Sequence, residues 1–182
     1  AHCSAAAERG DEEVMDFGTL RAIVARLQEG GVGVFHLTGG EPMVRFDDVL
    51  ALIREFASQS DFWVDTSGIK LGPEQAQALR DAGAAGVFVS LNHWDPEVHD
   101  AFRGTPNSFS WATKALRACV EAGLPVGLSL CPTRSFANRA DLMRYAELAR
   151  DAGAFCIRIV EPRASGRWAG TDVLLRPDDI AV

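Results

Sequence analysis

The stretch from Ala122 to Thr133, AGLPVGLSLCPT, contains the change of pattern that decides the fold. An Ala-Gly pair is typical of a helix C-terminus, because glycine adopts the left-handed conformation needed there without a steric penalty. A proline and a mostly apolar run of strand length follow, and polar residues end the run. The stretch therefore predicts a helix end, a buried strand and a loop in immediate succession.

The same order of elements recurs along the chain. Ala-Gly precedes an apolar run at Gly83, Gly123 and Gly153, although the intervals differ and the sequence is not a strict repeat. The expected helices are 16–28, 46–56, 73–82, 109–121 and 139–153. The expected strands are 33–38, 62–66, 86–92, 124–131 and 155–162, and a polar excursion fills 93–108. Strands that alternate with helices predict one α/β domain with a parallel sheet, either barrel-like or doubly wound.

The composition excludes several classes of function. The chain has 182 residues, 47% of them hydrophobic, and a net charge of −7, so its composition gives no sign of a basic footprint for nucleic acid. No apolar run approaches the roughly 18 residues of a membrane span. The four cysteines lack CxxC spacing, which is typical of a protein from the reducing cytoplasm. They are Cys3, Cys119, Cys131 and Cys156.

Polar residues follow the apolar runs where each strand is expected to end. These segments are 38–42, 65–68, 90–93, 131–133 and 161–163. The carboxyl ends of parallel strands lie at one edge of the sheet, and α/β folds bind their ligands there. The sequence therefore predicts a polar site at that edge.

The last expected strand carries a charge among apolar residues. Strict alternation directs Phe155, Ile157 and Ile159 toward the helices and the residues between them toward the inside. Arg158 is one of the inward residues, and an unpaired buried charge is costly. We therefore expect Arg158 to have a partner or a ligand.

Several motifs resemble the radical S-adenosylmethionine superfamily, in the branch of the molybdenum-cofactor cyclases and SPASM-type maturases. They are LTGGEP (37–42), TSG (66–68), SLN (90–92), DPEVHDAFRGTPNSFSWATKAL (95–116) and EAGLPVGLSLCPT (121–133). The resemblance extends over almost the whole chain, and the motifs occur in the family order. It implies that 1–182 form a radical S-adenosylmethionine core domain, a partial (β/α)6 TIM-like barrel with five of its strands in this chain.

The resemblance also implies the cofactors, which are S-adenosylmethionine and a [4Fe–4S] cluster. The opening AHCSAAAE is similar to the end of the family's CxxxCxxC motif. Cys3 would then be the third cluster ligand, and His2 would contact adenine or shield the cluster. The first two cysteines and the first strand would precede Ala1, so we expect an N-terminally truncated core of an oxidoreductase or maturase. Three thiolates are needed to hold the cluster, so we expect this chain alone to be inactive.

The GGEP segment would hold the amino-acid end of the cofactor. Gly39 and Gly40 would let the backbone approach the ligand, Glu41 would pair with its ammonium group, and Pro42 would fix the turn. An ordinary strand-to-helix turn is the alternative. The other cofactor contacts that the resemblance implies are Thr66, Ser90, Asn92, Arg103 and Val160. Thr66 and Ser90 could instead cap strand ends, Arg103 could order its loop, and Asn92 replaces the usual Asp.

Four basic residues are candidates for the substrate side: His36, His93, Arg158 and Arg163. His36 lies two residues before Thr38, where related cyclases carry a basic residue that faces the substrate. The alternative for each is a polar group satisfied within the fold.

The function implied by the resemblance is reductive cleavage of S-adenosylmethionine, followed by hydrogen abstraction from an unidentified substrate in cofactor, natural-product or peptide modification. The implied partners are a small-molecule or peptide substrate and an electron donor such as a flavodoxin or ferredoxin, with no nucleic acid and no membrane.

Two alternatives stay open. The first is a non-radical, aldolase-like barrel enzyme that uses a lysine or acid/base residues, although the chain offers only Lys70 and Lys114 as lysines. The second is a half-barrel scaffold or binding module without a cluster.

Overall fold

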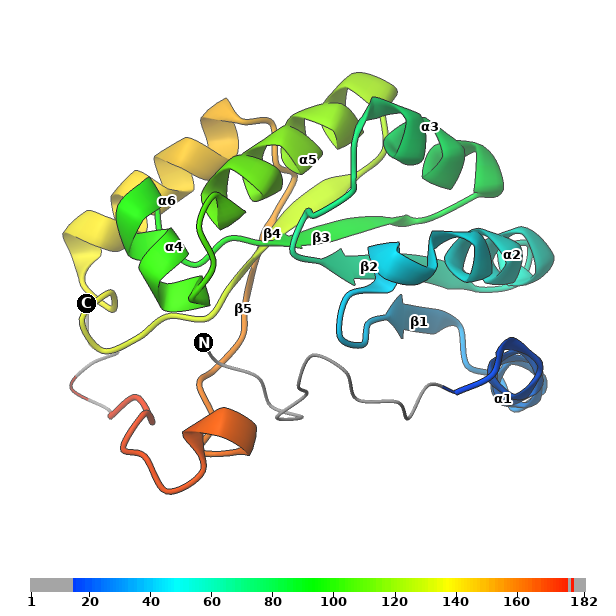
Figure 1. Ribbon diagram of the computed structural model, residues 1–182, viewed down its shortest axis with the longest axis horizontal. Helices are drawn as coiled ribbons and strands as arrows, with labels where there is room; N and C mark the ends of the chain where they lie inside the picture. Colours follow the sequence, from blue (N-terminus) through cyan, green and yellow to red (C-terminus); the bar gives the residue numbers. More distant parts are fainter. Residues whose placement is uncertain (1–14, 177, 179–182) are drawn as a thin grey trace.

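The fold is built on a sheet of five parallel strands, in a computed structural model that describes residues 15–176 and 178 (Figure 1). The strands are β1 (Val34–Leu37), β2 (Asp61–Thr66), β3 (Gly86–Ser90), β4 (Val126–Leu130) and β5 (Ile157–Ile159). Each strand pairs in parallel with the next one along the chain. The spatial order is therefore the sequence order.

Helices connect the strands. They are α1 (Phe17–Glu29), α2 (Phe46–Phe56), α3 (Pro73–Ala82), α4 (Pro96–Arg103), α5 (Ser108–Ala122) and α6 (Arg139–Asp151). Two short 3₁₀ helices, η1 (Pro42–Arg45) and η2 (Gly166–Trp168), follow β1 and β5. All the helices expected from the sequence are present, and their ends agree to within two residues.

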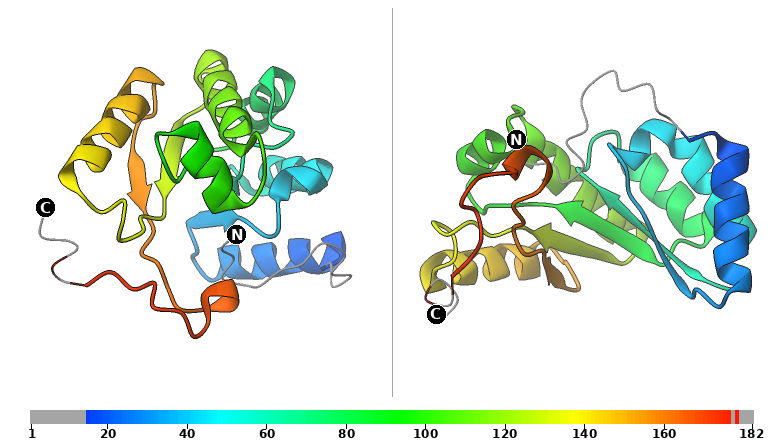
Figure 2. Two further views of the ribbon diagram at one scale, coloured as in Figure 1. Left: turned by 60° about the vertical axis from the view of Figure 1, so that its left-hand side comes forward. Right: turned by 90° about the horizontal axis from the view of Figure 1, so that it is seen from below.

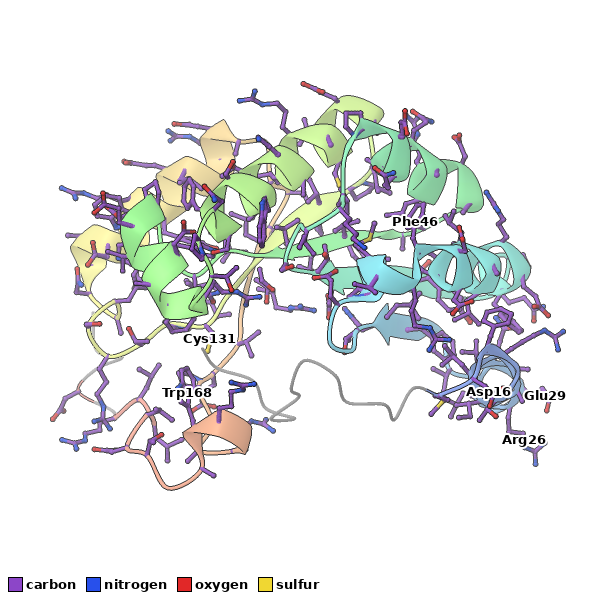
Figure 3. All side chains as sticks on the ribbon, in the orientation of Figure 1. Asp16, Arg26, Glu29, Phe46, Cys131 and Trp168 are labelled. Carbon is purple, nitrogen blue, oxygen red and sulfur yellow. The ribbon has the colours of Figure 1, made fainter. Side chains whose placement is uncertain are left out.

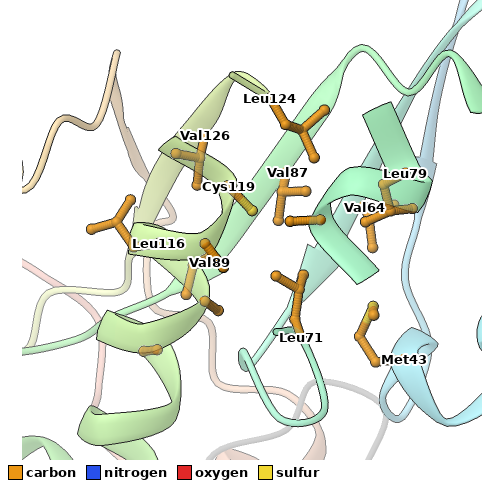
Figure 4. Packing of buried hydrophobic residues seen from close by; sticks show 14 of the residues in the cluster. Met43, Val64, Leu71, Leu79, Val87, Val89, Leu116, Cys119, Leu124 and Val126 are labelled. Atoms are coloured by element: carbon orange, nitrogen blue, oxygen red, sulfur yellow. The ribbon is translucent and has the colours of Figure 1, made fainter. Parts of the chain in front are cut away.

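The core lies between the sheet and the helices. Phe62, Val64, Val87 and Leu128 lie on the helix-facing side of their strands and have 0% exposure. Their side chains pack against apolar residues of the helices, such as Leu79 of α3 (Figure 4). Burial of alternate strand residues is the main source of stability in such a layer.

The helices that follow β1 to β4 lie on one face of the curved sheet, and its other face is open (Figure 2). A doubly wound sheet would reverse its strand order and carry helices on both faces. The consecutive order and the single helical layer are those of a partial barrel. The fold-class prediction is therefore confirmed, in its barrel-like form.

Glycines make room for aromatic rings on the open, inner face. A Cβ at Gly86 would lie 2.4 Å from the Trp63 ring, and one at Gly127 would lie 2.7 Å from the Phe88 ring. The two rings have centroids 5.1 Å apart. The inner face therefore carries an aromatic layer along the strands, in contrast to the polar residues at their carboxyl ends.

Helix α4 lies in the segment that the sequence predicted as a polar excursion, so that prediction was wrong. Asp95 is its N-cap and accepts hydrogen bonds from the backbone of residues 97 and 98, Pro96 occupies its first turn, and Gly104 ends it at φ +64°. Only His99 of this helix is buried, so the segment has no apolar periodicity. The Asp-Pro pair was the available signal.

The last strand is shorter than expected, and two of its predicted orientations were wrong. Phe155 precedes β5, is 57% exposed, and has its ring centroid 5.7 Å from that of Trp63 on the inner face. Ile159 is 64% exposed and lines a cavity at the strand ends, so it does not pack under a helix. Ile157 packs against the core as predicted. Alternation fails at Phe155 because the regular strand begins only at Ile157.

No helix in the described part of the chain combines the length and apolar character needed to cross a membrane.

Candidate functional site

A cavity of about 680 Å³ opens at the carboxyl ends of the strands. The predicted residues that line it are Gly39, Gly40, Glu41, Thr66, Ser90, Asn92, Arg103, Arg158, Val160 and Arg163. Cys131 borders it from the end of β4 and Trp168 from η2 (Figure 3). One cavity thus gathers most of the polar residues that the sequence placed at this edge.

Glu41 joins the ends of β1 and β2. Its Oε1 accepts hydrogen bonds from the Thr66 hydroxyl at 2.6 Å and from the Met43 backbone N–H at 3.1 Å. Its Oε2 accepts from the hydroxyl of Ser67 at 2.6 Å and from the Ser67 backbone N–H at 2.9 Å. All four donors are neutral, so the bonds fix the carboxylate without cancelling its charge.

The Gly39-Gly40 turn presents bare backbone to the cavity. Gly39 has φ +146°, a conformation that favours glycine, and a Cβ at either position would meet nothing within 4 Å. Pro42 is buried at the start of η1 and does not line the cavity. The turn is therefore open toward the cavity, and the hydrogen bonds of the adjacent Glu41 hold it in place.

Thr66 and Ser67 act on Glu41. Thr66 is 2% exposed, and its hydroxyl donates to Glu41 and accepts from the Gly68 N–H at 3.0 Å. The contacts of Ser67 with Glu41 were not anticipated, although it stands beside Thr66 in the quoted TSG motif. The hydroxyls of Thr66 and Ser67 therefore position the Glu41 carboxylate. For Thr66 this agrees with the alternative interpretation, in which it satisfies polar groups at a strand end.

Asn92 is held from two sides and has one unused donor. Its Oδ1 accepts from the Cys131 N–H at 3.1 Å, and its backbone N–H donates to His99 Nδ1 at 3.0 Å. Asn92 is 6% exposed, and its Nδ2 is buried without a hydrogen-bond partner among the described residues. Because an unpaired buried donor is costly, this amide is a strong candidate for a ligand contact.

His99 was not identified as a site residue from the sequence. It is 1% exposed, and burial is the main cause that lowers its pKa to about 4, with a further contribution from Arg103. The imidazole is therefore neutral at pH 7, which leaves Nδ1 as the acceptor for Asn92. Its side of α4 also carries Arg103 to the cavity.

A charged group on the inner face reaches into the cavity through Asp65 and Arg158. Arg158 Nη2 lies 3.0 Å from Asp65 Oδ1, and His36 Nδ1 lies 3.3 Å from Asp65 Oδ2. The Arg158 guanidinium is also 4.0 Å from the centroid of the Phe88 ring. The expectation that Arg158 needs a partner is confirmed. Asp65 was not selected from the sequence, because only the folded sheet places it beside Arg158.

The charges of the cavity are balanced. Glu41, Asp65 and Glu161 contribute three carboxylates. Arg103, Arg158 and Arg163 contribute three guanidinium groups. A lining with both signs and no excess of either suits a zwitterionic ligand.

His36 and His93 do not line the cavity. His36 is on the inner face beside Asp65. His93 Nδ1 accepts the Asp95 N–H at 2.9 Å, and its ring packs against those of Trp94 and Phe136. The structure thus places His93 in a local structural role. His2 and Cys3 lie outside the described residues.

The described cysteines do not form a metal centre. No three His, Cys, Asp or Glu residues in the described part of the chain are placed to hold a metal ion. Cys119 is fully buried in α5, and burial raises the pKa of its thiol to about 12. Burial also raises the pKa of Cys131 and of Cys156. The residues that line the cavity suit S-adenosylmethionine. The described cysteines do not form a ligand set for an iron–sulfur cluster.

Comparison with known proteins gives a consistent result. The profile of the Radical SAM superfamily matches residues 1–155. The chain is 34% identical over 170 residues to a probable GTP 3',8-cyclase of Aeropyrum pernix, covering 92% of this chain and 45% of the relative. It is 34% identical over 173 residues to the mycofactocin maturase MftC of Mycobacterium tuberculosis, covering 94% and 43%. The chain therefore spans about half the length of these curated relatives.

Solved structures show the same fold at low sequence identity. Streptococcus suis SuiB bound to the precursor peptide SuiA gives a TM-score of 0.70 at 15% identity, covering 86% of this chain and 35% of that one. The enzyme anSMEcpe with bound AdoMet and Cp18Cys peptide gives 0.71 at 16% identity, covering 97% and 53%.

Proposed function

This chain belongs to the radical S-adenosylmethionine superfamily, and we propose that its cavity binds S-adenosylmethionine for reductive cleavage and hydrogen abstraction from a substrate. The observation that carries the proposal is the pairing of a charge-balanced cavity with the orphaned amide of Asn92. A plain strand-to-helix turn has no need of either feature.

The amino-acid end of the cofactor would lie on the Gly39-Gly40 turn. Its ammonium group would be drawn to the charge of Glu41, whose partners are all neutral donors. Its carboxylate would face the guanidinium of Arg103, which reaches the cavity from α4. Because the ammonium and the carboxylate share one α-carbon, a carboxylate and a guanidinium that each bind one of them fix the orientation of the amino-acid end.

The remaining predicted contacts would hold the nucleoside end. Asn92 Nδ2 would donate to a ligand oxygen, which removes the cost of leaving this donor unpaired. Ser90 lines the cavity and offers a hydroxyl, and Val160, which follows β5, offers an apolar contact for the adenine.

When it is bound and reduced by one electron, S-adenosylmethionine supplies the 5′-deoxyadenosyl radical that removes a hydrogen atom from the substrate. The chain's own residues orient the cofactor and exclude water from it. Cys3 stays the proposed ligand of the family's [4Fe–4S] cluster, and the described residues add none to it.

The inner face favours a substrate without a polyphosphate group, and thus a role in peptide or cofactor-precursor modification. A triphosphate such as that of GTP requires several unpaired cations. Here Arg158 is already paired with Asp65, and the cavity has no excess of positive charge. Two solved structures of the same fold hold peptides, which supports a maturase-type reaction over a GTP cyclase.

The lysines argue against the aldolase alternative. Lys70 and Lys114 are the only lysines of the chain, and neither lines the cavity at the strand ends. An amine nucleophile is therefore absent from the lining of that cavity. The other alternative, a half-barrel scaffold without a cluster, is tested by whether the protein forms 5′-deoxyadenosine.

The test is the formation of 5′-deoxyadenosine. The full-length protein, with the two cysteines expected before Ala1, is reconstituted with iron and incubated without oxygen with S-adenosylmethionine and dithionite, and the product is quantified by mass spectrometry. We expect Glu41→Gln, which keeps the size of the side chain and removes its charge, to lower the rate at least tenfold. The exposed Glu29→Gln is the matched control and should behave as wild type. No product from a cluster-loaded protein would favour the scaffold.

A further inference from the structure

A second cavity, of about 510 Å³, lies on the outer, helical side of the molecule. Its wall is the loop from β2 to α3, and the facing wall is one side of α5, with Trp111, Lys114, Arg117 and Glu121. Figure 1 shows this loop beside α5. No catalytic or cofactor-binding residue proposed above belongs to it.

The charge of this cavity is opposite to that of the chain. The chain has a net charge of −7, but Lys70, Lys114 and Arg117 face one carboxylate, Glu121. The three cations are exposed, and none makes an ion pair with the described residues. Both lysines of the sequence are here. Unpaired cations on an acidic protein form a local attractive field for an acidic partner.

The loop that presents Lys70 is held firmly. A Cβ at Gly68 would lie 2.8 Å from the Trp111 carbonyl oxygen, so the loop lies directly on the backbone of α5. Leu71 is 3% exposed and anchors the loop in the core. Lys70 itself has φ +59°, which is uncommon for a residue other than glycine. The backbone at Lys70 is therefore held at a fixed place on the surface.

The same loop separates the two cavities. Thr66 and Ser67 line the cavity at the strand ends, where they hold Glu41, and Gly68 lines the outer one. Lys70 on the outer surface is only three positions along the chain from Ser67, which holds Glu41. The loop that contains residues 66–71 thus joins the outer surface to the proposed cofactor site.

We propose that this surface, formed by Lys70, Trp111, Lys114 and Arg117, docks an acidic one-electron carrier protein. The proposal rests on the proposed function, because reductive cleavage consumes one electron from outside the chain. The reduced carrier loses that electron, and the electron is taken up as the carbon–sulfur bond of S-adenosylmethionine breaks to give methionine and the radical. Attraction between the basic surface and an acidic carrier overcomes the repulsion expected from the net charge of −7.

The test compares two double variants with the same change of charge. Lys114→Glu with Arg117→Glu alters the docking surface on α5 and leaves the loop untouched. Arg54→Glu with Arg139→Glu is the control, since both arginines are exposed, lie on α2 and α6, and do not line the outer cavity. Formation of 5′-deoxyadenosine is measured with reduced flavodoxin, an acidic flavoprotein, and separately with dithionite.

With flavodoxin at low salt, we expect the docking variant to raise the KM for the carrier about tenfold, and the control to raise it by less than about twofold. The difference should shrink at high salt, because screening weakens exposed charges. With dithionite both variants should match wild type, because a small reductant needs no docking surface. Equal KM values for the two double variants would overturn the proposal.

Binding of flavodoxin without turnover separates this proposal from the proposed function. If neither reductant gives product, the proposed function fails, and the dissociation constant for flavodoxin still decides the docking. A constant about tenfold weaker in the docking variant than in the control supports the surface, and equal constants refute it.

Discussion

The two faces of the sheet differ in what they contain. Leu128 faces the helices with 0% exposure, and its neighbour Ser129 faces the inside and lies 3.4 Å from Arg158. Val64 and Asp65 differ in the same way on β2. Successive residues of one strand therefore serve different purposes, stability on the helical face and binding on the inner face. Substitutions of neighbouring residues should separate these purposes.

The largest effect is expected for Leu128→Ala. The substitution leaves a cavity beneath the helices and should lower the free energy of unfolding by about 2–5 kcal/mol. Ser129→Ala removes one long hydrogen bond and should cost less than about 1 kcal/mol. Urea unfolding followed by circular dichroism measures both. Equal losses would show that the inner face contributes to stability as much as the core does.

A smaller effect, dependent on pH, is expected from His99. Its pKa is about 4 in the folded protein and 6.5 ordinarily, so the unfolded chain binds more protons between these pH values. The free energy of unfolding should therefore decrease as the pH falls from about 6.5 to about 4, by roughly 3 kcal/mol. Above pH 6.5 this contribution is fully present.

The variant His99→Asn isolates the His99 contribution from that of the carboxylates. It keeps an acceptor for the Asn92 N–H and cannot titrate in this range. The difference in unfolding free energy between wild type and variant should narrow on acidification from pH 7 to pH 4. A constant difference would mean that His99 is accessible to protons in the folded state.

The smallest effect is expected for Asp65→Asn on the inner face. The Asp65 side chain is 19% exposed and that of Arg158 is 31% exposed, so solvent screens their ion pair. The loss of unfolding free energy should be about 1 kcal/mol or less, and smaller at high salt. Thermal unfolding at two salt concentrations measures it. A loss above about 3 kcal/mol would assign Asp65 to the structural core instead.

The sequence predicted the regular part of the fold well, because burial on one face produces periodic patterns. These patterns predicted the helices and the central residues of the strands. They also predicted that Glu41 lies at the carboxyl-terminal edge of the sheet. Helix α4 was missed, since only His99 is buried in it. Phe155 was misplaced because alternation applies only inside a regular strand.

The site was predicted less completely, for a physical reason. Glu41, Ser90 and Arg103 stand in motifs that the sequence displays. Asp65 and His99 act through partners that only the folded chain brings close, 93 residues apart for Asp65 with Arg158 and 7 residues apart for His99 with Asn92. Neither pairing leaves a periodic pattern.

The most direct test of the central claim is the affinity for S-adenosylmethionine, measured by isothermal titration calorimetry without reductant on the iron-reconstituted full-length protein, which includes the cysteines expected before Ala1. We expect a dissociation constant at least tenfold weaker for Glu41→Gln than for wild type, with wild-type affinity for Glu29→Gln. Equal affinity in all three proteins, with the fold intact by circular dichroism, would contradict the assignment of the strand-end cavity to this cofactor.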